Sequence, residues 1–325
     1  MLRSLAARLA HSVLILLGVT LVVASLIKLI PGDPVDVIAA GDPGLTAADL
    51  DRLRDQMGLN KSVAEQFFSY LAGALQGDLG TSIRQHVPVS ELVWDRVPAT
   101  AELAFWAIVF ALALAVPLGV ATALRRGSWV DYGGTVIAVL GVSTPSFLLA
   151  VMLILWFAVD LRMLPASGYR GSALAALAAG DLAGFGKALR YFLLPAVSLS
   201  FVMIAVNARL IRSAMLEVLE QDFITFATAK GVPRLVIILR HAMRNALLPV
   251  VTMLGLQMGS LLSGTVVIEN VFAWPGIGRL AVDAIHNRDY AVIQAVVLIS
   301  AVLFILLNLV VDGLYRVIDP RVRND

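Results

Sequence analysis

Ser25 and Lys28 stand at the S-x-x-K spacing at which a lysine can activate a serine nucleophile. Both residues lie in an apolar stretch without supporting catalytic motifs, so we interpret Lys28 as a side chain that extends toward the membrane interface. The four histidines of the chain are His11, His86, His241 and His286. No pair of them has the spacing of zinc ligands. The G-x-x-x-x-G-K-[ST] motif that cradles nucleotide phosphates does not occur. The sequence therefore predicts no catalytic residues and no metal or cofactor site in this chain.

A second set of residues places polar side chains inside or beside long apolar stretches. Because polar groups are costly in hydrocarbon, such residues are candidates for lining a path across a membrane. The candidates are Ser143, Thr144, Asn207, Gln257, Ser260, Ser263 and Glu269. Hydrogen bonding between helices explains the serines and the threonine equally well. Glu269, like Glu102, is expected near the outer end of an apolar stretch, where water reduces the cost of a carboxylate.

The composition indicates what must position these residues. The chain has 325 residues, of which 59% are apolar and 15% charged, and its mean hydropathy is +0.86. Soluble domains have about 25% charged residues, so a water-soluble monomer is excluded, and disordered chains are poor in apolar residues. The absence of cysteine excludes a disulfide scaffold and a thiolate metal site. A net charge of +2 is too balanced to indicate nucleic-acid binding.

Six apolar stretches are long enough to cross a bilayer as helices, which takes roughly 20 residues each. They are Leu9–Ile30, Leu103–Leu124, Gly133–Val159, Tyr191–Ile211, Ala246–Ile268 and Ala291–Val311. None alternates like a strand of a membrane β-barrel, so we predict an all-α polytopic membrane protein with six transmembrane helices. Outside the long loop of residues 31–98, lysine and arginine are more frequent on the side of the termini, which places both termini in the cytoplasm.

These spans divide the chain into four expected parts. They are an N-terminal transmembrane helix (1–30), an extracytoplasmic loop (31–98), a core of five helices (99–315) and a cytoplasmic tail (316–325). The acidic loop is expected to fold as a small helical subdomain. One of its helices begins with a capping-box-like pair, Thr46 and Asp49, and ends near Gly58. Contact between this loop and a soluble extracytoplasmic partner is a further possibility.

The loop of residues 212–245 between the fourth and fifth spans contains an amphipathic pattern. Its apolar residues recur at helical spacing, which predicts one helix from Leu216 to Lys230; they are Leu216, Leu219, Phe223 and Phe226. The sequence Lys230-Gly231 followed by Pro233 is a helix stop signal. The helix could lie on lipid headgroups, but its acidic polar face favours docking into a groove of a partner protein.

Motifs along nearly the whole chain resemble those of the permease subunits of bacterial ABC importers for dipeptides and oligopeptides, specifically the B-type membrane subunit. They are Leu29–Val35, Gly77–Ser82, Leu164–Tyr169, Leu194–Ala196, Ala227–Gly231, His241–Ala246 with Pro249, and Glu269–Gly278 continuing to Arg288–Tyr290. One motif departs from the pattern. The general importer loop reads E-A-A-x-x-x-G, whereas alignment on Gly231 places Thr225 and Phe226 at its first two positions. This departure narrows the substrate class. It also puts in doubt any salt bridge that the family assigns to the acidic residue at the first position, which is Thr225 here.

The resemblance implies a type I ABC importer permease fold in the bacterial cytoplasmic (inner) membrane. The chain would not be catalytic by itself. It would pair with a homologous second permease, with two ATPase subunits that bind ATP and Mg, and with an extracytoplasmic peptide-binding protein, and it would work by alternating access. The resemblance assigns ATPase coupling to the helix of the 212–245 loop. The residues concerned are Leu216, Leu219, Asp222, Phe223, Phe226, Ala227, Lys230 and Gly231.

Other functions stay open at this point. Members of the same family import nickel chelates, glutathione or murein peptides, and nothing in the spans fixes peptide length. A self-sufficient secondary transporter is a different class, but the spans lack the central chain of Asp, Glu or His residues that proton coupling uses. An intramembrane enzyme has no catalytic constellation to support it.

Overall fold

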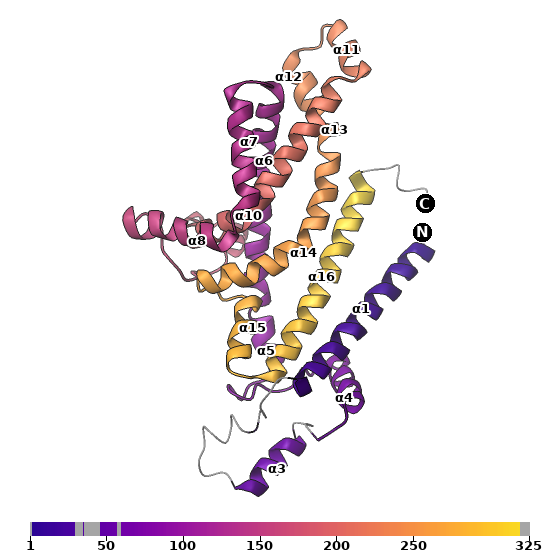
Figure 1. Cartoon of the computed structure of the whole chain (residues 1–325), viewed down its shortest axis with the longest axis vertical. Coiled ribbons are helices and arrows are strands. Elements are labelled where there is room, and N and C mark those ends of the chain that lie inside the picture. Colours follow the sequence, from indigo (N-terminus) through magenta and orange to yellow (C-terminus); the bar gives the residue numbers. More distant parts are fainter. Residues whose placement is uncertain (1, 30–34, 36–45, 57–59, 319–325) are drawn as a thin grey trace. The chain divides into compact units, whose positions relative to one another are not determined.

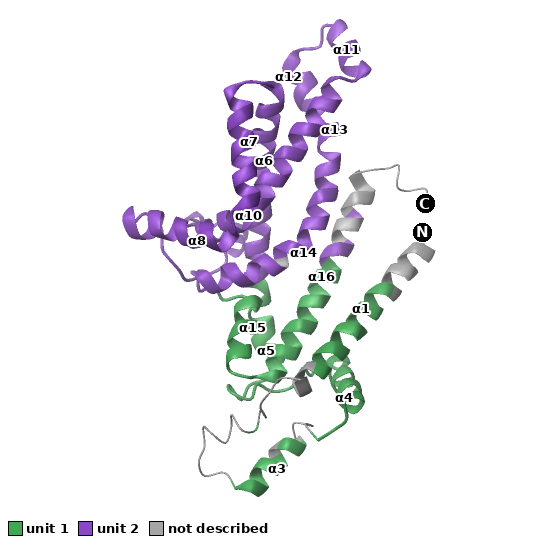
Figure 2. Cartoon of the chain, viewed as in Figure 1, with its two compact units in different colours: residues 1–98, 275–306 green, residues 99–274, 307–325 purple. Residues whose placement is uncertain are grey.

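The computed structural model describes residues 2–29, 35, 46–56 and 60–318, which are mostly helical (Figure 1). Within these residues no strand forms beyond an isolated bridge between Thr81 and Pro88. The prediction of an all-α protein is therefore confirmed. The chain divides into two compact units: unit 1 is Met1–Pro98 with Pro275–Leu306, and unit 2 is Ala99–Trp274 with Leu307–Asp325 (Figure 2).

Unit 1 combines the first helix and the predicted outer loop with a segment from late in the chain. Its helices are α1 (Leu2–Leu29), α3 (Ala47–Gln56), α4 (Val63–Leu75), α5 (Val89–Trp94), α15 (Ile277–His286) and the first part of α16 (Tyr290–Ile318). The core of this unit joins Leu79 and Val93 to Ile277 and Val292. The second half of the outer loop thus packs against α15 and α16.

The capping-box-like start predicted at Thr46 is confirmed. The Asp49 N–H donates to the Thr46 hydroxyl over 3.3 Å, and the Thr46 N–H donates to the Asp49 carboxylate over 3.1 Å. Hydrogen bonds from the Thr46 hydroxyl and backbone lower the pKa of Asp49. Helix α4 begins with a full capping box between Ser62 and Glu65. The predicted helix end near Gly58 and residues 319–325 of the predicted tail lie outside the described residues.

Unit 2 is built around the long helix α10. In chain order, its elements are α6 (Val97–Leu124), α7 (Trp129–Ser143), α8 (Ser146–Leu153), the π-helix η1 (Ile154–Asp160), α9 (Ala173–Ala178), α10 (Leu182–Leu219), α11 (Asp222–Ala229), α12 (Arg234–Val236), the π-helix η2 (Ile237–Ala242), α13 (Met243–Ala246) and α14 (Leu248–Val271). Helix α10 packs against α7, α8, α9 and α14. A Cβ atom at Gly119 of α6 would lie 2.7 Å from the Ala208 carbonyl oxygen, and one at Gly141 of α7 would lie 2.5 Å from the Ala205 Cβ atom. These glycines therefore let α6 and α7 approach the backbone of α10.

Three described segments are helical, long and apolar enough to cross a membrane: Val89–Leu124, Leu182–Leu219 and Tyr290–Leu309. The number rises to five if each of two bent helix pairs counts as one span. The first predicted span corresponds to α1, whose described apolar stretch, His11–Ser25, is shorter. The total of six spans therefore stays a prediction.

The third predicted span, Gly133–Val159, is not one continuous helix. Helix α7 and the segment Ser146–Asp160 meet at an angle of 107°. The bend lies at Thr144, whose backbone is extended (φ −93°, ψ 120°), directly before Pro145. A proline disfavours helical backbone at the residue before it, which accounts for the break. In contrast, Pro117 lies inside helix α6 and Pro195 lies inside helix α10.

Candidate functional site

The loop of residues 212–245, hereafter called the coupling loop after the role that the resemblance implies, lies at one end of unit 2 and contains the short helix α11 (Figure 1). The predicted single helix from Leu216 to Lys230 is wrong. Helix α10 ends at Leu219, and Gln221 has extended backbone (φ −77°, ψ 149°) before α11 starts at Asp222. Leu216 and Leu219 therefore belong to the last turns of α10, where both are half-buried.

The break turns a different face of α11 toward the core than the sequence predicts. Ile224 is only 6% exposed and packs in one cluster with Val218 and Ile237. In contrast, Phe223 is 40% exposed and Phe226 is 62% exposed. Ile224 anchors the helix in its own unit and leaves two aromatic side chains uncovered in this chain. Exposed apolar groups of this kind mark interaction surfaces when they cluster.

The end of α11 is fixed by a Schellman motif centred on Gly231. The Gly231 N–H donates to the Thr228 carbonyl over 2.9 Å, and the Val232 N–H donates to the Ala227 carbonyl over 3.2 Å. Gly231 has φ +78°, a left-handed conformation that strains residues with a Cβ atom. Next to it, the Lys230 ammonium lies 4.5 Å from the centre of the Phe226 ring. The predicted helix stop at Lys230-Gly231 is thus confirmed.

A partly buried ion pair that no sequence pattern indicated holds the base of this region. Arg212 of α10 donates two hydrogen bonds to the Asp131 carboxylate of α7, from Nε over 2.6 Å and from Nη2 over 2.8 Å. The Gly127 N–H adds a third donor over 3.0 Å. The two partners are 81 positions apart in the chain, so no local spacing signals the pair. A bidentate pair of this kind fixes the relative orientation of the two side chains and also balances their charges.

Two of the residues proposed to line a path, Asn207 and Gln257, are brought together by the structure. The Asn207 amide is fully buried and donates to the Gln257 side-chain oxygen over 2.9 Å and to the Met203 carbonyl over 2.8 Å. This contact joins α10 to α14. The Asn207 Oδ1 atom is buried and has no hydrogen-bond partner among the described residues.

The other polar candidates do not join this pair. Ser260 and Ser263 are exposed on α14 and donate to carbonyls of their own helix, those of Gln257 and Gly259. Ser143 is exposed and Thr144 half-buried, and both lie at the bend after α7. The path-lining role of these four residues stays a prediction.

Glu269 and Glu102 are more buried than expected. Glu269 is fully buried and accepts a hydrogen bond from the Thr100 hydroxyl over 2.6 Å, and Glu102 is only 4% exposed and accepts one from the Leu174 N–H over 2.9 Å. The expectation that water relieves these carboxylates is therefore wrong. Hydrogen bonds inside unit 2 satisfy them instead.

The segment that follows Glu269 closes over the start of α6. The Trp274 indole N–H donates to the Ala99 carbonyl over 2.9 Å, and Trp274 is 1% exposed. Its ring meets that of Tyr169 edge to face, with centroids 4.8 Å apart. The neighbouring Gly168 N–H donates to the Phe272 carbonyl over 2.9 Å. Two of the sequence motifs, Leu164–Tyr169 and Glu269–Gly278, therefore meet in the same cluster.

Known families and proteins match nearly the whole length of the chain. Residues 115–324 match the family described as binding-protein-dependent transport system inner membrane component, and residues 1–104 match the N-terminal part of such membrane components. The dipeptide transport system permease protein DppB of Escherichia coli K12 is 40% identical over 322 residues, which cover 95% of each chain. DppB of Alkalihalophilus pseudofirmus is 40% identical over 320 residues, covering 95% of this chain and 96% of the relative.

A relative with a different named substrate has the same percentage identity. The glutathione transport system permease protein GsiC of Salmonella typhimurium LT2 is 40% identical over 308 residues, which cover 95% of this chain and 94% of GsiC. Among solved structures, an inward-facing form of the MetNI methionine ABC transporter superposes with a TM-score of 0.53 and 18% identity, covering 70% of this chain and 96% of that one. This likeness supports the type I importer fold. The chain belongs to the family of binding-protein-dependent transport system inner membrane components, the permease subunits of ABC importers.

Proposed function

We propose that this chain forms one half of the translocation pathway of an ATP-driven importer for dipeptides or oligopeptides. The observation that carries the proposal is the 40% identity with dipeptide permeases over 95% of both chains. Permeases of this family depend on a binding protein and on ATPase subunits. We infer a complex of this chain with a homologous second permease, two ATPase subunits and one extracytoplasmic peptide-binding protein. The chain itself performs no catalysis.

Coupling to the ATPase subunits is assigned to α11 and the turn after it. The uncovered rings of Phe223 and Phe226 would enter a groove of the ATPase, while Ile224 holds the helix to its own unit. The Schellman end at Gly231 keeps the helix short and fixes the direction in which the chain leaves it. Movement of the ATPases would then pass through α11 into α10 and the arm formed by η2 and α13. Alternating access follows when these elements move as rigid bodies.

The proposed orientation places the coupling loop and both termini in the cytoplasm. Arginines of the loop, such as Arg234, Arg240 and Arg244, support this orientation through the positive-inside rule. The 31–98 segment would then face outward, where the binding protein delivers substrate. Of the polar path candidates on α14, Ser260 and Ser263 are the best placed in this chain to meet substrate, because both are exposed.

Co-purification and reconstitution test the proposal. The tagged chain, expressed with its neighbouring transport genes, should retain a second permease and an ATPase, and the complex in liposomes should import a labelled dipeptide only with ATP and the binding protein. Import by this chain alone, without ATP, would overturn the assignment to an ABC importer.

Glutathione is a second candidate substrate, and the equal identity with GsiC favours it. A binding measurement on the associated binding protein distinguishes the two candidate substrates. Saturable binding of dipeptides without binding of glutathione supports the first. The reverse result assigns the importer to glutathione and leaves the coupling mechanism unchanged.

A further inference from the structure

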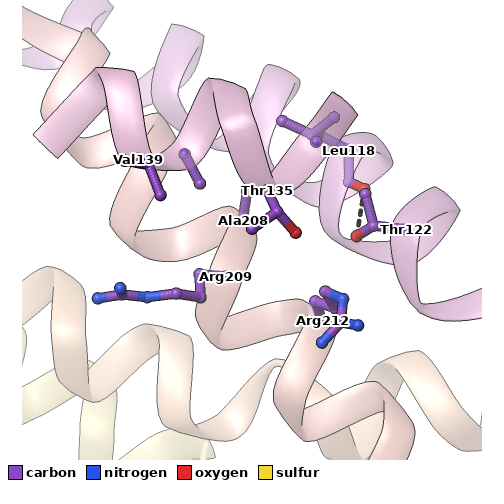
Figure 3. A pocket seen from close by; sticks show the side chains of 9 residues that line it. Leu118, Thr122, Thr135, Val139, Ala208, Arg209 and Arg212 are labelled. Carbon is purple, nitrogen blue, oxygen red and sulfur yellow. Dashed lines mark hydrogen bonds between the residues drawn. The ribbon is translucent and has the colours of Figure 1, made fainter. Parts of the chain in front are cut away.

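A pocket of about 170 Å³ opens between α6, α7 and α10 of unit 2 (Figure 3). Most of its wall is apolar or small, from Leu118 of α6, Ala138 and Val139 of α7, and Ala208 of α10. Pockets that enclose a whole small ligand usually measure about 300–1,000 Å³. A pocket below that range suits one part of a larger molecule, the rest of which lies outside.

The polar groups of the pocket are already bonded, with one exception. The Thr122 hydroxyl donates to the carbonyls of Leu118 and Gly119, and the Thr135 hydroxyl donates to the Asp131 carbonyl. Arg212 is held by the Asp131 carboxylate. These groups therefore have little capacity left for a ligand.

Arg209 is the exception. It lines the pocket and is exposed, and its guanidinium has no hydrogen bond or ion pair with any residue that the structure describes. Figure 3 shows Arg209 and Arg212 extending in opposite directions from α10. Since Asp131 neutralises Arg212, the free positive charge of the site is that of Arg209. A guanidinium binds phosphate with paired, charge-assisted hydrogen bonds.

The apolar surroundings continue outside the pocket. Helix α7 exposes Val136, Val139 and Leu140, which are 56%, 56% and 54% exposed. A cation beside an exposed apolar surface matches an anionic group attached to a hydrocarbon chain. In the orientation of the proposed function, Arg209 lies in the last turns of a span at its cytoplasmic end. Basic pockets between helices on that side bind the headgroups of anionic lipids.

We propose that this pocket binds the headgroup phosphate of an anionic phospholipid of the cytoplasmic leaflet. Arg209 binds the phosphate, Leu118 and Val139 contact the first methylenes of an acyl chain, and the rest of the chain lies along α7. The inference rests on the proposed function only for its orientation, because it needs neither substrate nor ATP. Lipid binding and peptide import can therefore fail independently.

A titration of the purified, delipidated complex with fluorescent phosphatidylglycerol tests the proposal, with phosphatidylcholine as the uncharged comparison. Arg209→Gln should weaken phosphatidylglycerol binding about tenfold, because it removes a charge-assisted contact. Arg209→Lys should recover part of the affinity. Arg125→Gln is the matched control, since Arg125 is exposed near the α6–α7 connection but does not line the pocket.

A second variant tests the pocket without touching the cation. Val139→Trp adds bulk at the pocket wall and should lower phosphatidylglycerol binding, while gel filtration reports whether the complex stays assembled. Equal binding by Arg209→Gln and the unaltered complex would overturn the proposal, and so would an equal loss in Arg125→Gln. Displacement of phosphatidylglycerol by millimolar inorganic phosphate would reassign the site to free phosphate and overturn the lipid assignment.

Discussion

The Ser82 hydroxyl donates a 2.5 Å hydrogen bond to the Asp289 carboxylate, which lies 207 positions further along the chain. Both residues are buried in unit 1. The Ser82 oxygen also accepts the Gln85 N–H over 3.1 Å, and the other Asp289 oxygen lies 3.5 Å from the Val292 N–H in the first turn of α16. One contact thus ties the end of the Gly77–Ser82 motif to the start of the last long helix.

Replacing Ser82 should therefore destabilise unit 1. We expect Ser82→Ala to lower the free energy of unfolding by about 1.5–3 kcal/mol, because it leaves a buried carboxylate without a hydroxyl donor. Thermal unfolding in detergent, followed by tryptophan fluorescence, measures the effect. The control is Thr81→Val, which removes a hydroxyl from the exposed neighbouring position. Equal melting temperatures for both variants would contradict the stabilising role of the contact.

The sequence predicts the helical class and most of the spans because membrane crossing depends on average apolarity over about 20 residues. An average has no direction, however, so it does not detect the 107° bend after α7. The positions of the prolines do not predict the bend either. Pro145 follows the extended residue of the bend, whereas Pro117 and Pro195 lie within continuous helices, as membrane helices tolerate.

The candidate site also has some features that the sequence predicts and others that it does not. The stop at Gly231 depends on local chemistry, namely a glycine in the left-handed region followed by a proline, and it is predictable from the sequence. The orientation of α11 is not predictable in this way. The helical backbone is interrupted at Gln221, and Ile224 packs in the core where the sequence predicts the phenylalanines. Likewise, the pairing of Asp131 with Arg212 joins two helices distant in sequence, and only the packing of α7 on α10 reveals it.

The left-handed backbone of Gly231 predicts how substitutions there affect coupling. Gly231→Val places a β-branched side chain at φ +78° and costs about 1–2 kcal/mol locally. The turn after α11 should open, so peptide transport and peptide-stimulated ATP hydrolysis should fall while the amount of inserted protein stays the same. Both activities are measured on the reconstituted complex.

Gly180 supplies the matched control for this experiment. It has φ +70° and lies in the turn between α9 and α10, away from the coupling loop. Gly180→Val introduces comparable strain and should leave coupling unchanged. If both variants lose peptide-stimulated ATP hydrolysis to the same extent, the loss reflects strain in general and not the turn at Gly231.

The uncovered ring of Phe226 predicts a role in ATPase binding. Phe226→Ala should weaken retention of the ATPase by the tagged permease, because it removes a large aromatic anchor from the proposed interface. Co-purification in detergent followed by densitometry gives the ratio of ATPase to permease. Phe68→Ala is the control, since Phe68 is 65% exposed on α4 in unit 1. An unchanged ratio in Phe226→Ala would exclude this ring from the interface.

The ion pair of Asp131 and Arg212 should stabilise the packing of α7 on α10. Removing one partner leaves the other charge without its counterion, and fully buried pairs then lose about 3–5 kcal/mol. Because the Arg212 side chain is 29% exposed, we expect a smaller loss, about 2 kcal/mol, for Arg212→Gln. The double variant with Asp131→Asn should be less destabilised than the sum of the single variants. A double-mutant cycle on thermal unfolding checks this, and strict additivity would contradict a direct interaction.

Asn207 and Gln257 offer a test that separates a path-lining role from a structural one. Their hydrogen bond lies between α10 and α14, and Asn207 has no exposed surface in this chain. Hydrogen bonds between membrane helices contribute about 0.6 kcal/mol on average and up to about 1.7. Asn207→Leu and Gln257→Leu should each lower stability by about 1 kcal/mol, and the double variant by less than the sum. The selectivity among labelled peptides of different length should stay unchanged, as measured in competition uptake. A shift in selectivity without loss of stability would instead place Asn207 in the path and reject the structural role that its burial predicts.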